Sequence, residues 1–273
     1  MRVSEEKKIV NKGCGLHYWV YRAKEKECNN EWIIFLHGAG YDHEMFQKQL
    51  EVIPDTYNIL CSDARGHGLS VPMGDDFSIH LMLEDLLIMM KNEKIKDAIF
   101  VGHSMGGNVA QLFLYFYPEN VKGLVLIGCM NPMRVLTNKD KYLFRITPYL
   151  LKWCPWEKFI SIASYLGGVK PETRIYIAKH YYNMGKELLL KVFLEAMTCL
   201  QEDSSYHINK PLLILCGKRE YLLGVKKSAP KFQKRNKKCK VYMIENAGHN
   251  ANQDNPEKTN ELLLEFIKNY NDY

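Results

Sequence analysis

One short run around Ser104 constrains the fold of this chain more than any other feature. The serine stands between two glycines in the pattern G-x-S-x-G. Apolar residues at 97–101 predict a buried strand before it, and the apolar spacing of residues 108–116 predicts a helix after it. Such a junction forces the serine into a backbone conformation with positive φ, and a side chain at Gly102 or Gly106 would collide with the turn. The run therefore predicts a sharp strand-to-helix turn that presents a serine hydroxyl.

A second turn, after an apolar strand at 32–36, supplies what a nucleophilic serine needs. Attack on a carbonyl carbon creates an oxyanion, which must be stabilised by N–H groups that are already in place. One expected donor is the backbone N–H of Met105, directly after the serine. The strand ends in His37-Gly38-Ala39, and the backbone N–H of Ala39 is the expected second donor. His37 and Gly38 are expected to support this turn.

Two turns after late strands supply a base and an acid. His249 follows the apolar strand at 240–244 and is the only histidine after position 207. Glu220 follows the apolar strand at 211–216, so the three residues occur in the order serine, acid, histidine, which is typical of this machinery on an α/β sheet. We expect His249 to act as the base, and Glu220 to hold its imidazole in the correct tautomer.

Together these segments resemble the α/β-hydrolase superfamily, in particular its lid-bearing esterases and lipases. The resemblance rests on five segments: His37-Gly38, the D-x-R-G-x-G-x-S pattern at 63–70, the elbow at 102–107, the acid turn at 217–220, and Gly248-His249. These landmarks extend over almost the whole chain. The resemblance implies that segment 63–70 is structural, with Arg65 tying loops together beneath the elbow.

The acid position departs from the family pattern. The family usually has aspartate there, and this chain has Glu220. The additional methylene displaces the carboxylate by about one bond length, so the loop must compensate. Two aspartates could replace it but are less favoured: Asp203 precedes the strand rather than following it, and Asp254 follows the histidine.

The alternation of strand and helix patterns predicts an α/β fold of the α/β-hydrolase type: a mostly parallel sheet of about eight strands, helices on both faces, and an inserted helical lid. Residues 1–130 and 207–273 are assigned to the core, and 131–206 to the lid. The expected elements are strands at 8–10, 16–21, 32–36, 58–61, 97–101, 124–127, 212–215 and 241–244, and helices at 44–52, 79–91, 108–116, 139–152, 155–166, 172–182, 186–200 and from 255. We expect most of the many lid aromatics to pack within the lid or on the sheet, and the rest to line an apolar pocket.

Composition excludes several classes of protein. The net charge is +6, and the basic run at 226–240 carries eight Lys or Arg residues and no acid. We interpret that run as solvated surface, with an anionic surface as the alternative partner; because it lacks interleaved aromatics, nucleic-acid binding is not expected. No apolar stretch long enough for a transmembrane helix occurs, and the N-terminus lacks the apolar core of a signal peptide. The eight cysteines include no C-x-x-C pair, which favours reduced thiols and a cytoplasmic protein.

The expected activity is hydrolysis of a carboxylic ester, as in a carboxylesterase or a monoacylglycerol lipase, through an acyl-enzyme on Ser104. The substrate is expected to be a small molecule with an apolar acyl or aromatic group. No cofactor and no metal are expected. Three alternatives stay open: a carbon–carbon bond hydrolase or a cofactor-free perhydrolase of the same fold, and a binding protein that has lost activity. The sequence does not indicate an oligomeric state.

Overall fold

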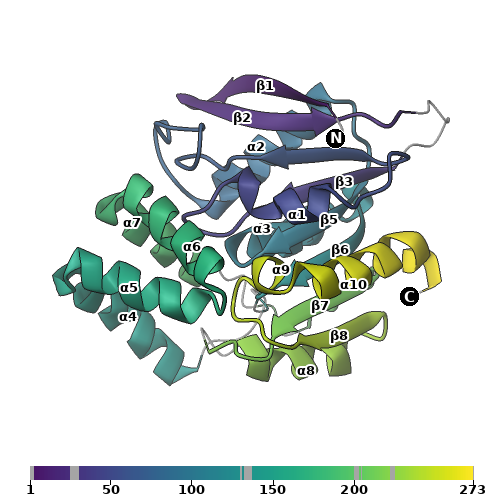
Figure 1. Cartoon of the computed structure of the whole chain (residues 1–273). Helices are drawn as coiled ribbons and strands as arrows, with labels where there is room; N and C mark the ends of the chain where they lie inside the picture. Colours follow the sequence, from purple (N-terminus) through teal and green to yellow (C-terminus); the bar gives the residue numbers. More distant parts are fainter. Residues whose placement is uncertain are drawn as a thin grey trace.

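The computed structural model describes residues 3–24, 31–129, 131, 137–199, 203, 205–221 and 225–272. Its centre is an eight-stranded sheet with the strand order β1-β2-β4-β3-β5-β6-β7-β8 (Figure 1). The two pairings that involve β2 are antiparallel, and every later pairing is parallel. The strands are β1 (Ser4–Asn11), β2 (Cys14–Tyr21), β3 (Trp32–Leu36), β4 (Asn58–Ser62), β5 (Ala98–His103), β6 (Val121–Ile127), β7 (Leu212–Gly217) and β8 (Cys239–Ile244). The predicted mostly parallel sheet is confirmed.

The central strands are apolar along their whole length because both faces of the sheet are covered. Successive side chains of a strand point to opposite faces. In β3, Ile34 and Leu36 join one apolar cluster together with helices α2 (Ile79–Asn92) and α3 (Met105–Phe116). Ile33 and Phe35 join the other cluster, together with α10 (Pro256–Asn269). The remaining core helices are η1 (His43–Phe46), α1 (Gln47–Leu50), η2 (Pro118–Asn120), α8 (Val225–Arg235), α9 (Ala251–Asp254) and η3 (Tyr270–Asp272).

Four helices are inserted between β6 and β7. They are α4 (Asn138–Trp153), α5 (Trp156–Gly167), α6 (Pro171–Met184) and α7 (Lys186–Thr198), and they lie together at one end of the sheet (Figure 1). Leu189 of α7 is fully buried in one sheet cluster and Val192 of α7 in the other. The inserted helices are therefore anchored to the core by buried apolar contacts.

The described aromatic side chains of the inserted helices fall into a packed group and an exposed group. Those that are packed or half-buried are Trp156, Phe159, Tyr176, Tyr181 and Phe193. Exposed ones are Tyr142, Trp153, Tyr165 and Tyr182, on the solvent faces of α4, α5 and α6. The Phe144 and Tyr149 side chains lie outside the described part of the chain. More than half of the described aromatics therefore pack, as expected, whereas the remaining four are exposed to solvent instead of lining a pocket.

Some element boundaries differ from the sequence predictions. The helix predicted at 44–52 is shorter and divided into η1 and α1, and the helix after the serine begins at Met105 rather than at 108. The basic run at 226–240 forms most of α8 and the turn to β8, and its described lysine side chains are exposed. Its interpretation as solvated surface is confirmed. Within the described ranges, no helix combines the length and apolar character needed to cross a membrane.

Candidate active site

Ser104 occupies a strained turn between β5 and α3. Its backbone has φ 49° and ψ −113°, so the predicted positive φ is confirmed. The Ser104 N–H donates to the carbonyl oxygen of Ile127 at 2.9 Å, which ties the turn to the end of β6. A Cβ at Gly102 would lie 2.6 Å from the Gly106 oxygen, and one at Gly106 would lie 2.1 Å from the Leu36 oxygen. Only glycine fits at either position, as the sequence predicted.

His249 and Glu220 meet although they belong to different turns. The Nδ1 atom of His249 lies 2.6 Å from the Oε2 atom of Glu220. Both side chains are buried. The Arg219 N–H donates to the Ala247 carbonyl, and a Cβ at Gly217 would lie 2.1 Å from the Gly248 oxygen, so the two turns are in direct backbone contact. The close approach of the turns accommodates the longer glutamate.

The two aspartates considered as alternative acids have other partners. The Asp254 carboxylate accepts the backbone N–H groups of Val169, Lys170 and Gly248 at 2.8–3.0 Å. Asp203 accepts hydrogen bonds from the segment that follows it, at 2.6–3.1 Å. Asp254 therefore fixes the histidine turn to the α5–α6 connection, and Glu220 is the carboxylate bonded to His249.

The histidine turn also contacts the end of β6 and the elbow. A Cβ at Gly128, which has φ +60°, would lie 3.1 Å from the Nδ1 atom of His249. His103, directly before the serine, donates from Nε2 to the His249 carbonyl oxygen at 3.2 Å. Burial lowers the pKa of His103 well below its ordinary value, so its ring is neutral. Ser104, Glu220 and His249 thus lie in turns at the carboxyl ends of β5, β7 and β8. Sequence reasoning missed His103, since nothing in the motif spacing marks it.

The turn after β3 lies against the start of α3. A Cβ at Gly106 would contact the Leu36 and His37 carbonyl oxygens, and one at Gly38 would lie 2.4 Å from the His103 ring. His37 donates from Nδ1 to the Gly38 carbonyl at 2.8 Å, and its Nε2 accepts the Ala64 N–H at 2.9 Å. Burial lowers the pKa of His37, which keeps this ring neutral. His37 and Gly38 therefore lie at the centre of the contacts that hold the turn carrying Ala39.

Tyr41 connects this turn to the rest of the site. Its hydroxyl donates to Asn250 Oδ1 at 3.2 Å and lies 3.2 Å from the Tyr181 hydroxyl. The rings of Tyr41 and Tyr181 are stacked, with centroids 5.5 Å apart. The β3 turn, the histidine turn and α6 thus meet at one buried phenol. The sequence analysis overlooked Tyr41 and Asn250, although the second is adjacent to His249.

Known proteins resemble this chain in sequence and in fold. A family model described as the alpha/beta hydrolase fold matches residues 31–152. The human monoacylglycerol lipase ABHD6 is 25% identical over 254 residues, which are 86% of this chain and 74% of that protein. The serine hydrolase CCSP0084 of Cycloclasticus zankles superposes with a TM-score of 0.79 at 17% identity, covering 98% of this chain and 99% of its own. An esterase of Thermogutta terrifontis superposes with a TM-score of 0.78 at 18% identity, covering 97% and 99%.

The chain has the α/β-hydrolase fold.

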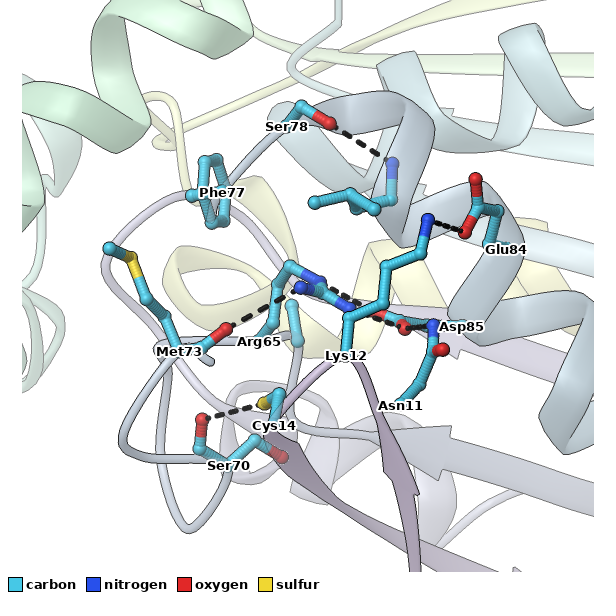
Figure 2. Close-up of polar contacts among 12 residues, drawn as sticks. Asn11, Lys12, Cys14, Arg65, Ser70, Met73, Phe77, Ser78, Glu84 and Asp85 are labelled. Carbon is cyan, nitrogen blue, oxygen red and sulfur yellow. Dashed lines mark hydrogen bonds and ion pairs between the residues drawn. The ribbon is translucent and has the colours of Figure 1, made fainter. Parts of the chain in front are cut away.

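In this α/β-hydrolase, the segment 63–70 is a structural brace. Arg65 is fully buried and donates from Nε and Nη2 to the two carboxylate oxygens of Asp85, each at 2.7 Å (Figure 2). Its Nη1 donates to the carbonyl oxygens of Asp76 at 3.0 Å and Met73 at 3.4 Å. The expected structural role is confirmed, but Arg65 ties its loop to α2 rather than to the elbow.

One group of side chains could in principle hold a cation. Within the described part of this hydrolase, Asp42, Glu44 and His180 are the only three His, Cys, Asp or Glu residues whose potential ligand atoms lie within 4.8 Å of one another. Asp42 follows the β3 turn and His180 lies on α6. The group is separate from the serine, histidine and glutamate and is considered further below.

Proposed function

We propose that this α/β-hydrolase cleaves carboxylic esters through an acyl-enzyme on Ser104, with His249 as the base and Glu220 as the orienting acid. The observation that carries the proposal is the 2.6 Å hydrogen bond between His249 and Glu220, beside a serine held at positive φ. Because Glu220 accepts the Nδ1 proton, the Nε2 lone pair of His249 is available for the serine proton. The name of the human relative, a monoacylglycerol lipase, supports an ester substrate.

The mechanism has two halves. Ser104 Oγ attacks the ester carbonyl carbon while His249 Nε2 takes the hydroxyl proton. The resulting oxyanion accepts hydrogen bonds from the backbone N–H groups of Met105 and Ala39. The bond to the alkoxide then breaks, and His249 returns its proton to form the alcohol. Water adds to the acyl-enzyme with His249 as base, which releases the acid and restores the serine.

The inserted helices are proposed to be a lid over the site, and residues 131–206 to be its extent. They bear an aromatic cluster, with Trp156 stacked on Phe159 at 5.4 Å and Phe193 in contact with both Phe159 and Tyr181. Tyr181 in turn stacks on the turn that carries Ala39. This continuity supports an apolar acyl or aromatic group in the substrate. We also propose a cytoplasmic location, because the seven cysteines in the described ranges are free thiols.

The decisive test is turnover of p-nitrophenyl esters from acetate to palmitate, together with a fluorophosphonate label located by peptide mapping. We expect the label on Ser104 and an optimum within the ester series. A label on Ser104 without ester turnover would redirect the proposal to carbon–carbon cleavage, which cleavage of a vinylogous diketone would then reveal. The absence of both label and turnover would contradict the proposal, and a binding role would then remain.

Replacing Glu220 with glutamine is expected to lower kcat about 10⁴-fold. The neutral amide cannot stabilise the imidazolium, and its NH2 group can donate to Nδ1 and so favour the wrong tautomer of His249. The kcat of Glu220→Asp should lie between those of Glu220→Gln and the unmodified enzyme, since the shorter side chain withdraws the carboxylate from Nδ1. The measurement is kcat for the best p-nitrophenyl ester. The matched control is Glu261→Gln, an exposed carboxyl on α10, which should retain the activity of the unmodified enzyme. Equal activity of Glu220→Gln and the control would remove Glu220 from the mechanism.

A further inference from the structure

A polar cluster joins the β3 turn to α6 of the inserted helices. His180 lies 2.9 Å, through Nε2, from the Oδ2 atom of Asp42. The Tyr176 hydroxyl donates to the Oδ1 atom of the same carboxylate at 3.0 Å. The side chains of His180 and Asp42 are only 9% and 14% exposed. Asp42 follows Ala39, the proposed oxyanion donor, by three residues.

The hydrogen-bond partners of His180 require a cationic ring. Its Nδ1 faces the Tyr176 carbonyl oxygen at 2.8 Å, and its Nε2 faces the Asp42 carboxylate. Both partners are acceptors, so both ring nitrogens must carry a hydrogen. Burial opposes both charges, but the mutual hydrogen bond and attraction outweigh it. The pKa of His180 is accordingly raised above its ordinary 6.5, and that of Asp42 is lowered to about 2.

Other charged groups also face this ion pair. Glu44 presents its carboxylate from η1 within 4.8 Å of the other two groups, and Lys179 of α6 opposes the positive charge of His180. A cleft of about 490 Å³ borders the pair and is also lined by His43 and Asp63. Because the cleft opens beside the pair, protons can exchange with His180 without disruption of the core.

The same carboxylate shapes the turn that precedes it. Asp42 Oδ1 accepts the Glu44 N–H at 3.1 Å and thereby caps η1. A Cβ at Gly40, which has φ +80°, would lie 2.6 Å from the Tyr181 ring, so the backbone of the turn lies flat against α6. Tyr41 stacks on the same ring. The Gly40 backbone and the neighbouring Tyr41 therefore both pack against α6, directly after Ala39.

We propose that Asp42 and His180 are positioning residues that hold the Ala39 N–H at the oxyanion most firmly while His180 is protonated. The inference rests on the proposed ester hydrolysis. When pH rises through the raised pKa of His180, the neutral ring keeps a single N–H. It can then no longer donate to both the Asp42 carboxylate and the Tyr176 carbonyl oxygen, and the attachment of the turn to α6 weakens. The stabilisation is thus present at lower pH and disappears at higher pH. Because oxyanion contacts act mainly in the transition state, the loss appears in kcat rather than in KM.

The test measures kcat and KM from about pH 6 to about pH 10, on both sides of the ordinary histidine pKa. In the unmodified enzyme, kcat should decrease as pH rises above the pKa of His180, and this decrease is the basic limb of the pH profile. In His180→Gln this limb should vanish, with kcat about tenfold lower and KM within about twofold. His180→Lys, which keeps a cation opposite Asp42, should restore kcat and extend the plateau to higher pH. His207→Gln, an exposed histidine, is the matched control and should match the unmodified enzyme.

A second variant, Asp42→Asn, tests the inference even if His180→Gln does not fold. Asp42→Asn keeps an oxygen that can cap η1 but removes the negative charge. It should move the basic limb to lower pH by about one unit or more. NMR titration of the His180 ring needs no turnover, and should show the same displacement between the unmodified enzyme and Asp42→Asn. Absence of any ester turnover would therefore defeat the proposed function while this titration still tests the ion pair.

Two results would overturn the inference. The first is a basic limb that His180→Gln leaves unchanged. The second is loss of activity after treatment with a chelator, restored by Zn²⁺ alone, because this would make Asp42, Glu44 and His180 a cation site rather than an ion pair.

Discussion

Replacing Ser104 with alanine is expected to lower kcat about 10⁶-fold, since the acyl-enzyme cannot form without its nucleophile. Any turnover by Ser104→Ala that exceeds the uncatalysed rate would come from the oxyanion donors and from substrate binding. Alanine accepts the local backbone no worse than serine, because both carry a Cβ at φ 49°. The fold should consequently be retained, and the loss should be chemical.

The measurement is kcat for the best p-nitrophenyl ester, with the melting temperature recorded for each variant. The matched control is Ser4→Ala, a serine on the exposed strand β1, which should keep full activity. Fluorophosphonate labelling should be abolished in Ser104→Ala alone. If Ser104→Ala retained even about one hundredth of the activity, the assignment of the nucleophile would fail.

Replacing Arg65 with leucine is expected to lower the free energy of unfolding by about 3–5 kcal/mol. The substitution leaves the Asp85 carboxylate buried on α2 without its two hydrogen bonds from the guanidinium. It also removes a donor from the Asp76 and Met73 carbonyl oxygens, so the loop loses its attachment to the helix. Urea denaturation followed by circular dichroism measures the change.

An exposed ion pair in the same region supplies the comparison. Lys12 pairs with Glu84 at 2.6 Å, and both side chains are about half exposed (Figure 2). Lys12→Ala should therefore cost less than about 1 kcal/mol. In Arg65→Leu/Asp85→Leu, which removes both buried charges, most of the stability should return. A cost for Arg65→Leu no larger than that for Lys12→Ala would show that the buried pair does not brace the fold.

The elbow and the turn after β3 could be predicted because their determinants are local. A glycine before and after Ser104 is demanded by contacts as close as 2.1 Å, and the flanking apolar patterns specify a strand and a helix within a few residues. His249 and Glu220 could be located because chain order and the ends of apolar strands restrict the candidates to a few residues. Element boundaries were less predictable: α3 begins at Met105 because the helix starts within the turn itself.

The side-chain contacts between residues far apart in the chain were not predictable in the same way. His103 gives no signal in the sequence, yet it bonds the histidine turn from the middle of the elbow. Asp42 and His180 are 138 positions apart, and neither belongs to a motif. Arg65 stood out in a motif, but its partner on α2 did not.

The sequence by itself determined the strands and helices of the core and the strained turn at Ser104, and it singled out the histidine and the acid that we propose for the site. It could do so because backbone conformation and apolar periodicity depend on neighbours in the chain. Only the tertiary structure decided that Glu220 reaches His249, and that α6 fastens the turn beside Ala39. These contacts depend on how closely separate turns approach at the end of the sheet, which packing of the whole core sets to a fraction of an ångström.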